Sequence, residues 1–264
     1  MTGARQELKG RTALVTGASS GLGADFAREL AARGADVVLV ARRKERLEAL
    51  AAELRATGTR ADVVTRDLAD GAARASLLEE VTRGGRAIDV LVNDAGFGLF
   101  VRFVELGWDR ERQMLEIDVV ALVHLTKLFV RPMIERRFGR ILQVSSIGAY
   151  QPSPTYATYS AAKAFVLSFG QAIHDELRGT GVTCTVVSPG VTATEFLTVA
   201  GQQPTPYQRW TMMSSPAVAR AGVNAMLRGK ASVVPGLVNA LGAFSMSRLL
   251  PRRAATRLAG RLME

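Results

Sequence analysis

Short apolar runs alternate with longer amphipathic segments along most of the chain. The runs are almost continuously apolar, with little polar alternation, and cover residues 12–17, 36–41, 61–68, 88–96, 139–146, 182–190 and 231–236. Strands of this kind are buried on both faces, as in a parallel sheet that helices cover on both sides. The pattern therefore predicts seven strands in a mostly parallel sheet.

Helices are expected between these strands. Helical periodicity covers residues 24–34, 43–58, 75–83, 114–138 and 156–179, and Gly179 and Gly181 are typical helix stop signals. Strict alternation of strand and helix indicates right-handed crossovers. The predicted fold class is α/β, a doubly wound, Rossmann-like sheet with helices on both faces. No linker or repeat divides the chain, so residues 1–264 are expected to form a single domain.

Two segments depart from this alternation. Residues 191–230 lack clean periodicity and follow a strand end, where doubly wound sheets bind ligands, so an irregular substrate-lid insertion is expected there. Residues 245–264 form a basic, amphipathic tail. That tail is interpreted either as a solvated helix or as a contact for an acidic membrane surface or partner. The apolar stretch before it contains Pro235 and Arg248, and is too interrupted to span a membrane.

Composition narrows the function classes. The net charge is +10, but the basic residues are scattered and no aromatic-interleaved basic stripe occurs, so no nucleic-acid partner is expected. Cys184 is the only cysteine and the first residues lack an apolar run, which favours a reducing, cytoplasmic location. His124 and His174 do not have metal-ligand spacing, so no metal site is expected.

A glycine-rich turn follows the first predicted strand. Gly17, Gly21 and Gly23 have the spacing G-x-x-x-G-x-G and open a helix. Glycines let the backbone approach a ligand closely, and a helix N-terminus attracts phosphate. The alternative is a turn that only packs the helix against the strand. In an alternating strand–helix pattern, dinucleotide binding is favoured.

The end of the second strand indicates which dinucleotide. A carboxylate there would bond the ribose 2′-hydroxyl of NAD. This chain instead has Arg42 and Arg43 directly after the strand. Guanidinium groups suit a 2′-phosphate, so NADP is the expected cofactor and NAD the less favoured one. The alternative is that both arginines are solvated residues of a first helical turn.

A tyrosine–lysine pair is the candidate chemical group. Tyr159 and Lys163 are four residues apart and share one helix face. A nearby ammonium favours the phenolate, which lowers a tyrosine pKa from about 10 towards the range useful for acid–base catalysis. Tyr156 lies on the same face, so spacing alone leaves the choice open. An isolated pair of this kind is more often an ordinary amphipathic helix edge.

Five motifs favour a catalytic role for this pair over an ordinary helix edge. They are "TGASSGLG" (16–23), "NDAG" (93–96), "VSS" (144–146), "YSAAK" (159–163) and "SPGVTAT" (188–194), in this order. With them, the chain resembles the short-chain dehydrogenase/reductase family in its compact form, over roughly residues 8–195. The resemblance assigns the acid–base tyrosine to Tyr159, its lysine to Lys163, and the active-site serine to Ser146 rather than Ser145.

The same resemblance implies a cofactor site and a substrate pocket. Tyr150 and Tyr156 become candidates for lining the pocket, and Asp94 stands where many relatives have a second asparagine, a mild variation. The implied cofactor-binding residues are Gly17, Ser19, Ser20, Gly21, Leu22, Gly23, Arg42, Arg43, Asp67, Leu68, Asn93, Ala95, Gly96, Tyr159, Lys163, Pro189, Gly190, Val191 and Thr194.

One departure from the family pattern concerns catalysis. Many members carry an asparagine in the long helix after "NDAG", where a kink holds a water that links the lysine to solvent. The matching residue here is Asp118, which joins the candidate catalytic set. Its carboxylate either accepts a hydrogen bond from Lys163 or a water, or strengthens the charged form of Lys163 and so weakens the proton relay.

Together these features predict an NADP-dependent oxidoreductase that interconverts a ketone or aldehyde and an alcohol. An apolar substrate is expected from the residues of the insertion, which are Phe196, Leu197, Tyr207, Trp210, Met212 and Met213. The alternatives are an epimerase or dehydratase sibling, an NADP-binding regulatory or scaffold protein with little turnover, and a peripheral membrane binder. The resemblance implies a homodimer or homotetramer paired through the long helices that contain Asp118 and Tyr159.

Overall fold

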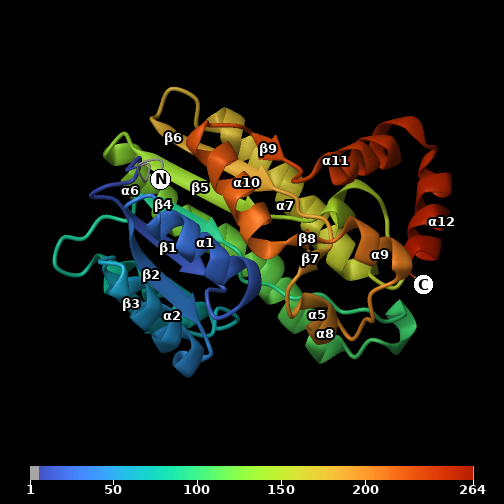
Figure 1. Cartoon of the computed structure of the whole chain (residues 1–264), viewed down its shortest axis with the longest axis horizontal. Helices are drawn as coiled ribbons and strands as arrows, with labels where there is room; N and C mark the ends of the chain where they lie inside the picture. Colours follow the sequence, from blue (N-terminus) through green and yellow to red (C-terminus); the bar gives the residue numbers. More distant parts are fainter. Residues whose placement is uncertain (1–5, 264) are drawn as a thin grey trace.

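A central parallel sheet organises the molecule. The computed structural model describes residues 6–263. Its seven-stranded sheet has the order β3-β2-β1-β4-β5-β6-β9, and every pairing is parallel (Figure 1). The strands are β1 (Thr12–Thr16), β2 (Asp36–Ala41), β3 (Ala61–Thr65), β4 (Val90–Asn93), β5 (Gly139–Val144), β6 (Val182–Val187) and β9 (Ser232–Val233). The predicted α/β, doubly wound fold class is confirmed.

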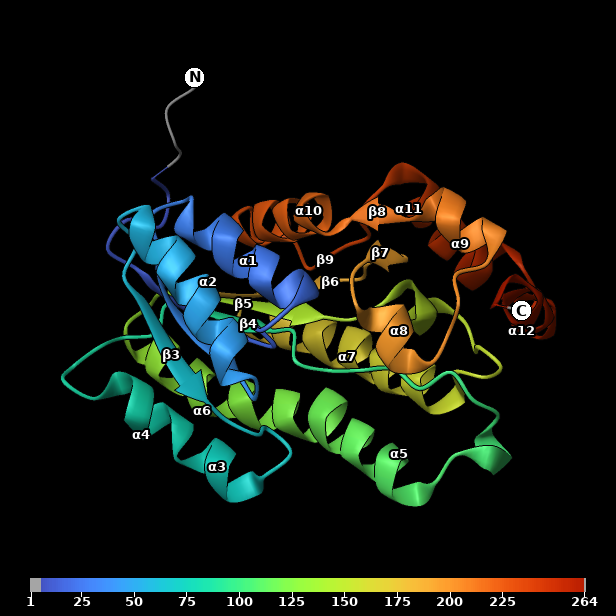
Figure 2. The ribbon, with the colours of Figure 1, turned by 60° about the horizontal axis from the view of Figure 1, so that its bottom comes forward.

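Helices cover both faces of the sheet. On one face lie α1 (Gly21–Ala31), α2 (Lys44–Ala56) and α10 (Ser215–Leu227). On the other lie α3 (Gly71–Ala75), α4 (Leu77–Thr82), α6 (Leu122–Glu135) and α7 (Ala157–Glu176) (Figure 2). Val15 packs with Phe26 in one core cluster, whereas its neighbour Leu14 packs with Phe129 in the other. Burial on both faces explains why the strands read as continuous apolar runs.

The strand order reverses between β1 and β4, which are hydrogen-bonded neighbours. The loops that leave these strands therefore run in opposite directions and open a crevice at the carboxyl edge of the sheet. The strands that end earlier than expected include β3, β4, β5 and β6, which end at Thr65, Asn93, Val144 and Val187. The residues just beyond them are mostly apolar or small but line that crevice, so composition did not separate them from the strands.

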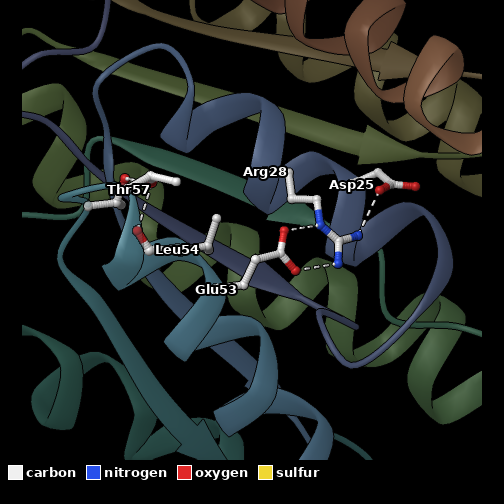
Figure 3. A network of polar contacts seen from close by, with 6 residues as sticks. Asp25, Arg28, Glu53, Leu54 and Thr57 are labelled. Atoms are coloured by element: carbon white, nitrogen blue, oxygen red, sulfur yellow. Dashed lines mark hydrogen bonds and ion pairs between the residues drawn. The ribbon is translucent and has the colours of Figure 1, made fainter.

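The expected long helix over 114–138 is interrupted. It consists of α5 (Trp108–Leu115), a π-helical segment η2 (Glu116–Ala121) and α6, and Asp118 lies in η2. π-Helical turns are rare and frequently occur at functional sites. On the opposite face, an ion pair between Arg28 and Glu53 at 2.8 Å joins α1 to α2, and Arg28 also pairs with Asp25 of its own helix at 2.9 Å (Figure 3).

Residues 191–230 are more regular than the sequence indicated. They form β7 (Thr192–Ala193), α8 (Phe196–Ala200), α9 (Pro206–Thr211), β8 (Met213–Ser214) and the sheet-covering helix α10. The apolar period of α10 was hidden because small residues face the core: a Cβ on Gly222 would lie 3.1 Å from the ring of Phe26. Only the part before α10 is a loop-rich insertion.

The C-terminal tail folds back onto the insertion. After α11 (Leu237–Phe244) and a second π-helical segment, η4 (Ser245–Leu249), helix α12 (Arg252–Met263) lies beside α9 at the right of Figure 1. Ala255 and Ala259 are buried in this contact region. Among residues 6–263, no helix combines the length and apolarity that crossing a membrane requires.

Candidate active site

A cavity of about 420 Å³ opens at the carboxyl edge of the sheet. Loops after β1 to β6, the insertion and the end of α12 form its walls. Most of the predicted site residues line it: Gly17, Ser19, Ser20, Gly21, Leu22, Arg42, Arg43, Asp67, Leu68, Ala95, Gly96, Ser146, Tyr159, Lys163, Pro189, Gly190, Val191 and Thr194. Gly23, Asn93 and Asp118 are not lining residues and lie behind the wall.

The glycine turn forms a tight cradle at one end of the cavity. Gly17 has a φ of +70°, and a Cβ there would lie 3.0 Å from the backbone nitrogen of Ala95. A Cβ on Gly23 would lie 2.4 Å from the carbonyl oxygen of Gly17. Only glycine allows this approach of turn, helix and neighbouring loop. The cradle precedes the N-terminus of α1, so the residues fit the phosphates of a dinucleotide.

Asp94, which stands where many relatives have an asparagine, brings a titratable carboxyl group to the site, and the substitution is therefore more than a mild variation. Its carboxylate lies against the cradle, where it accepts a hydrogen bond from the backbone N–H of Gly23. Burial, opposed by the charge of Lys163 and reinforced by that of Asp118, raises its pKa from 3.8 to about 7. A group that changes charge near neutral pH therefore adjoins the predicted phosphate site.

Asn93 serves the framework and not the cavity. Its side-chain amide donates to Thr126 and Gln143 at 3.1 and 3.0 Å, and its side chain is buried. The structure does not bring this side chain to the cavity, and a contact of Asn93 with the cofactor stays a prediction. Its hydrogen bonds join β4, β5 and α6 below the site.

The part of the groove beside the glycine turn is basic. Arg42, Arg43 and Arg66 line it. Arg43 donates to Ser19 Oγ at 3.1 Å, so it is tied to the glycine turn. Arg43 also forms an ion pair with Glu195 at 3.0 Å. Glu195 was not predicted, because its partner precedes it by some 150 residues and no local signal connects them.

The two adjacent serines have different partners. Ser145 donates its hydroxyl to the backbone oxygen of Lys163 at 2.7 Å. Ser146 begins the short helix η3 (Ile147–Tyr150), where its Oγ accepts the N–H of Gly148 at 3.0 Å. Ser146 is also hydrogen-bonded to Tyr159, which lowers the pKa of that phenol. This geometry favours Ser146 over Ser145 as the reactive serine.

Lys163 is buried between the sheet and the π-helical segment. Its Nζ lies 3.1 Å from Asp118 Oδ2 and donates to the carbonyl oxygen of Val144 at 3.3 Å. The ammonium also lies 5.6 Å from the centroid of the Tyr159 ring. The other oxygen of Asp118 accepts the backbone N–H of Phe97 at 3.1 Å. Asp118 therefore contacts the lysine directly.

Burial dominates the proton affinities of this cluster. It raises the pKa of Tyr159; Lys163 opposes it, and the charges of Asp118 and Asp94 add to it. The expected fall in the pKa of Tyr159 is therefore wrong for the site as a whole, although Lys163 acts in the expected direction. Burial lowers the pKa of Lys163, but Asp118, Tyr159 and Asp94 together raise it above its ordinary value.

The remaining cavity wall is largely aromatic and apolar. The ring centroids of Tyr156 and Phe196 lie 5.5 and 5.4 Å from that of Tyr159. The hydroxyl of Tyr156 donates to Gln202 at 2.9 Å, and the amide of Gln202 donates to the carbonyl of Met263 at 2.9 Å. Sequence reasoning missed Gln202 and Met263, because their role depends on the fold of the tail.

Several residues expected in the pocket lie elsewhere. Phe196, Leu197 and Tyr156 line the cavity. The predicted pocket residues that do not line it are Tyr150, Tyr207, Trp210, Met212 and Met213. Trp210 is 72% exposed. Within residues 6–263, no His, Cys, Asp and Glu side chains are grouped to hold a metal ion.

Fold and site together define a dinucleotide-binding oxidoreductase of the Rossmann type. Residues 11–205 match the sequence profile described as short chain dehydrogenase. The chain belongs to the short-chain dehydrogenase/reductase family, whose typical cofactor is NAD or NADP.

Three relatives illustrate this membership. The chain is 32% identical to a 3-oxoacyl-[acyl-carrier-protein] reductase of Haemophilus influenzae over 73% of this chain and 78% of that protein. A short-chain dehydrogenase from Sphingobium yanoikuyae in complex with NADPH is 31% identical, with a TM-score of 0.81 and coverage of 90% and 94%. A structure of a 7β-hydroxysteroid dehydrogenase is 25% identical, with a TM-score of 0.86 and coverage of 97% and 99%.

Proposed function

We propose that the chain is an NADP-dependent oxidoreductase that interconverts a ketone or aldehyde and the corresponding alcohol on a bulky, largely apolar substrate. One observation supports this most. A single cavity joins Ser146, Tyr159 and Lys163 to the glycine turn and to Arg43. A reacting carbonyl beside Tyr159 and a dinucleotide along the carboxyl edge of the sheet fit the same space.

Tyr159, Ser146 and Lys163 have different roles in the proposed proton transfer. The nicotinamide ring of the bound cofactor supplies or accepts the hydride at the carbonyl carbon. Tyr159 donates its phenolic proton to the carbonyl oxygen as negative charge develops there. Ser146 donates its hydroxyl proton to the same oxygen, and the N–H of Gly148, which its Oγ accepts, holds the hydroxyl in place. Lys163 supplies the fixed positive charge beneath the phenol.

The protonation state favours reduction. Burial raises the pKa of Tyr159 above its ordinary value of 10.0, so the phenol keeps its proton near neutral pH. A protonated phenol is the form needed to donate to a carbonyl oxygen, whereas alcohol oxidation needs the phenolate. Reduction is therefore expected to proceed at neutral pH and oxidation to require alkaline conditions.

The proposed preference for NADP depends on charge at the ribose end of the groove. Arg42 and Arg43 directly follow β2, and Arg66 directly follows β3, the strand next to β2 in the sheet. All three line the cavity. Planar guanidinium groups bind a phosphate through paired, charge-assisted hydrogen bonds. The similar Sphingobium yanoikuyae enzyme was solved with NADPH, which supports the same choice here.

The proposed substrate class follows from the other half of the cavity. Phe97, Ile117, Tyr156, Phe196 and Leu197 supply apolar or aromatic surface. Gln202 and Met263 close the region beside Tyr156. Similarity to a 7β-hydroxysteroid dehydrogenase over nearly the whole chain supports a rigid, polycyclic ketone or alcohol as the class to test first.

The test is NADPH consumption with ketones of increasing apolar bulk, including polycyclic ones. We expect turnover to increase with bulk and Tyr159→Phe to lose at least about 100-fold in kcat, because general acid catalysis contributes on that order. Tyr150→Phe is the matched control, since Tyr150 does not line the cavity. Equal activity of wild type and Tyr159→Phe would refute the proposal.

A second candidate is an NADP-binding regulatory or scaffold protein with little turnover. The observation that favours it is the ion pair between Lys163 and Asp118, because it ties up the ammonium that would otherwise assist Tyr159. Tight binding of NADPH without consumption of any ketone would favour this candidate.

Two further proposals concern partners. Val120, Ile134 and Phe165 are exposed apolar side chains on η2, α6 and α7, and we propose that these helices pair in a homodimer or homotetramer. Light scattering after gel filtration measures this, and a monomer would exclude it. Exposed Leu249 and Leu250 precede the arginine-rich helix α12, and exposed Leu258 lies within it, so an anionic membrane surface is a proposed peripheral contact. Co-sedimentation with anionic vesicles measures it, and neutral vesicles are the control.

A further inference from the structure

Three charged side chains bridge the mouth of the cofactor groove. Glu195 forms ion pairs with Arg43 at 3.0 Å and with Arg46 at 2.7 Å. The two arginines lie at the start of α2, whereas Glu195 is the N-cap residue of α8 in the insertion. Arg43 and Glu195 also line the cavity. This bridge therefore connects the ribose end of the groove to the insertion.

The bridge uses the guanidinium group that a 2′-phosphate needs. Arg43 is the arginine tied to the glycine turn through Ser19, so it lies at the expected position of the adenosine ribose. In this structure its Nη1 donates a hydrogen bond to Glu195 Oε2 at 3.0 Å. A carboxylate and a phosphate that share one guanidinium repel each other and divide its donors.

We propose that Glu195 is a specificity-determining residue that competes with the 2′-phosphate of NADP for Arg43 and so reduces the preference of this protein for NADP over NAD. This inference depends on the proposed use of NADP. NAD carries no 2′-phosphate, so its binding leaves the bridge intact.

The expected size of the effect is moderate. The side chains of Arg43 and Glu195 are 43% and 47% exposed, and exposed ion pairs contribute little because water screens them. Removing the carboxylate is therefore expected to tighten NADP binding by about fivefold and to change NAD binding by less than about twofold. Added salt should reduce this difference, because the interaction is accessible to solvent.

The experiment measures dissociation constants of NADP⁺ and NAD⁺ by calorimetry for the wild type and Glu195→Gln. Glu53→Gln is the matched control, because Glu53 forms a comparably exposed bidentate pair with Arg28 between α2 and α1 (Figure 3) and does not line the cavity. It removes the same unit of charge away from the groove. We expect tighter NADP⁺ binding only in Glu195→Gln.

A double-mutant cycle with Arg43→Ala separates competition for Arg43 from a general effect of charge. If Glu195 acts through Arg43, Glu195→Gln has no effect on NADP⁺ binding in the Arg43→Ala background. An undiminished gain in that background would overturn the inference, as would equal gains for NADP⁺ and NAD⁺ or none for either.

The same measurements distinguish a failure of the inference about Glu195 from a failure of the proposed use of NADP. If Arg43→Ala weakens NADP⁺ binding but Glu195→Gln does not strengthen it, only the inference about Glu195 fails. If the wild type binds NADP⁺ no more tightly than NAD⁺ and Arg43→Ala weakens neither, the proposed use of NADP fails, and the inference fails with it.

Discussion

Replacing Asp94 by asparagine should stabilise the fold in a pH-dependent way. Burial raises the pKa of this carboxyl from 3.8 to about 7, so the folded state holds the proton more tightly than the unfolded chain does. A shift of roughly 3 units at about 1.4 kcal/mol per unit corresponds to about 4 kcal/mol. Asp94 lines the cavity and is only partly buried, so solvent screening reduces this to about 2 kcal/mol.

The sign follows from linkage. With a raised folded pKa, the carboxyl costs nothing below the unfolded value, and its cost grows as the pH rises from about 4 to about 7, after which it is constant. The free energy of unfolding of Asp94→Asn minus that of wild type should therefore increase by about 2 kcal/mol between about pH 4 and about pH 8.

Urea unfolding followed by circular dichroism at several pH values measures this difference. The subtraction cancels the other titrating groups, because both proteins share them. Asp109→Asn is a suitable control, since Asp109 has a 94% exposed side chain. A difference between Asp94→Asn and wild type that stays constant with pH would refute the reasoning, because it would mean that Asp94 titrates alike in the folded and unfolded states.

Three further predictions concern the cradle, the lysine and the tail. Gly23→Ala places a Cβ 2.4 Å from Gly17 O and should weaken NADP⁺ binding at least about tenfold; unaltered calorimetry would contradict this. Asp118→Asn removes a charge that raises the pKa of Tyr159, so reduction should decline at lower pH than in wild type, and superimposable pH–rate profiles would exclude the effect. Ending the chain at Pro251 removes Met263, the hydrogen-bond partner of Gln202. KM for a bulky ketone should then rise about tenfold, while kcat for a small ketone is retained. An unchanged KM would show that α12 does not form part of the cavity wall.

Much of the fold was predictable because its signals are local. Continuous apolar runs identified each strand of the main sheet, and β2 begins and ends at the predicted residues, 36 and 41. Short motifs at strand ends brought Gly17, Ser146 and Tyr159 to one predicted cleft, because parallel strands place their carboxyl ends on one edge. The resemblance then chose between Tyr156 and Tyr159, which spacing alone left open.

The rest of the site depends on contacts between distant parts of the chain. Glu195 pairs with Arg43 across 152 residues, and Gln202 bonds Met263 across 61. Neither pair leaves a periodic or motif signal. The predicted direction of the Tyr159 pKa shift was wrong. The burial that raises this pKa, and the added charges of Asp118 and Asp94, arise only after the chain folds.

The π-helical turn at residues 116–121 also changes which face of the long helix points to the sheet. Before it, Met114 packs with Phe97 in a small cluster beside Tyr159; after it, Leu125, Phe129 and Met133 cover the sheet. A turn that closes at i+5 holds one residue more than an α-turn, so the two stripes are rotated against each other. Forcing all of these residues into α-helical turns would rotate one stripe away from its core and the carboxylate at 118 away from the lysine ammonium, whereas deleting one residue there would leave both stripes facing their cores.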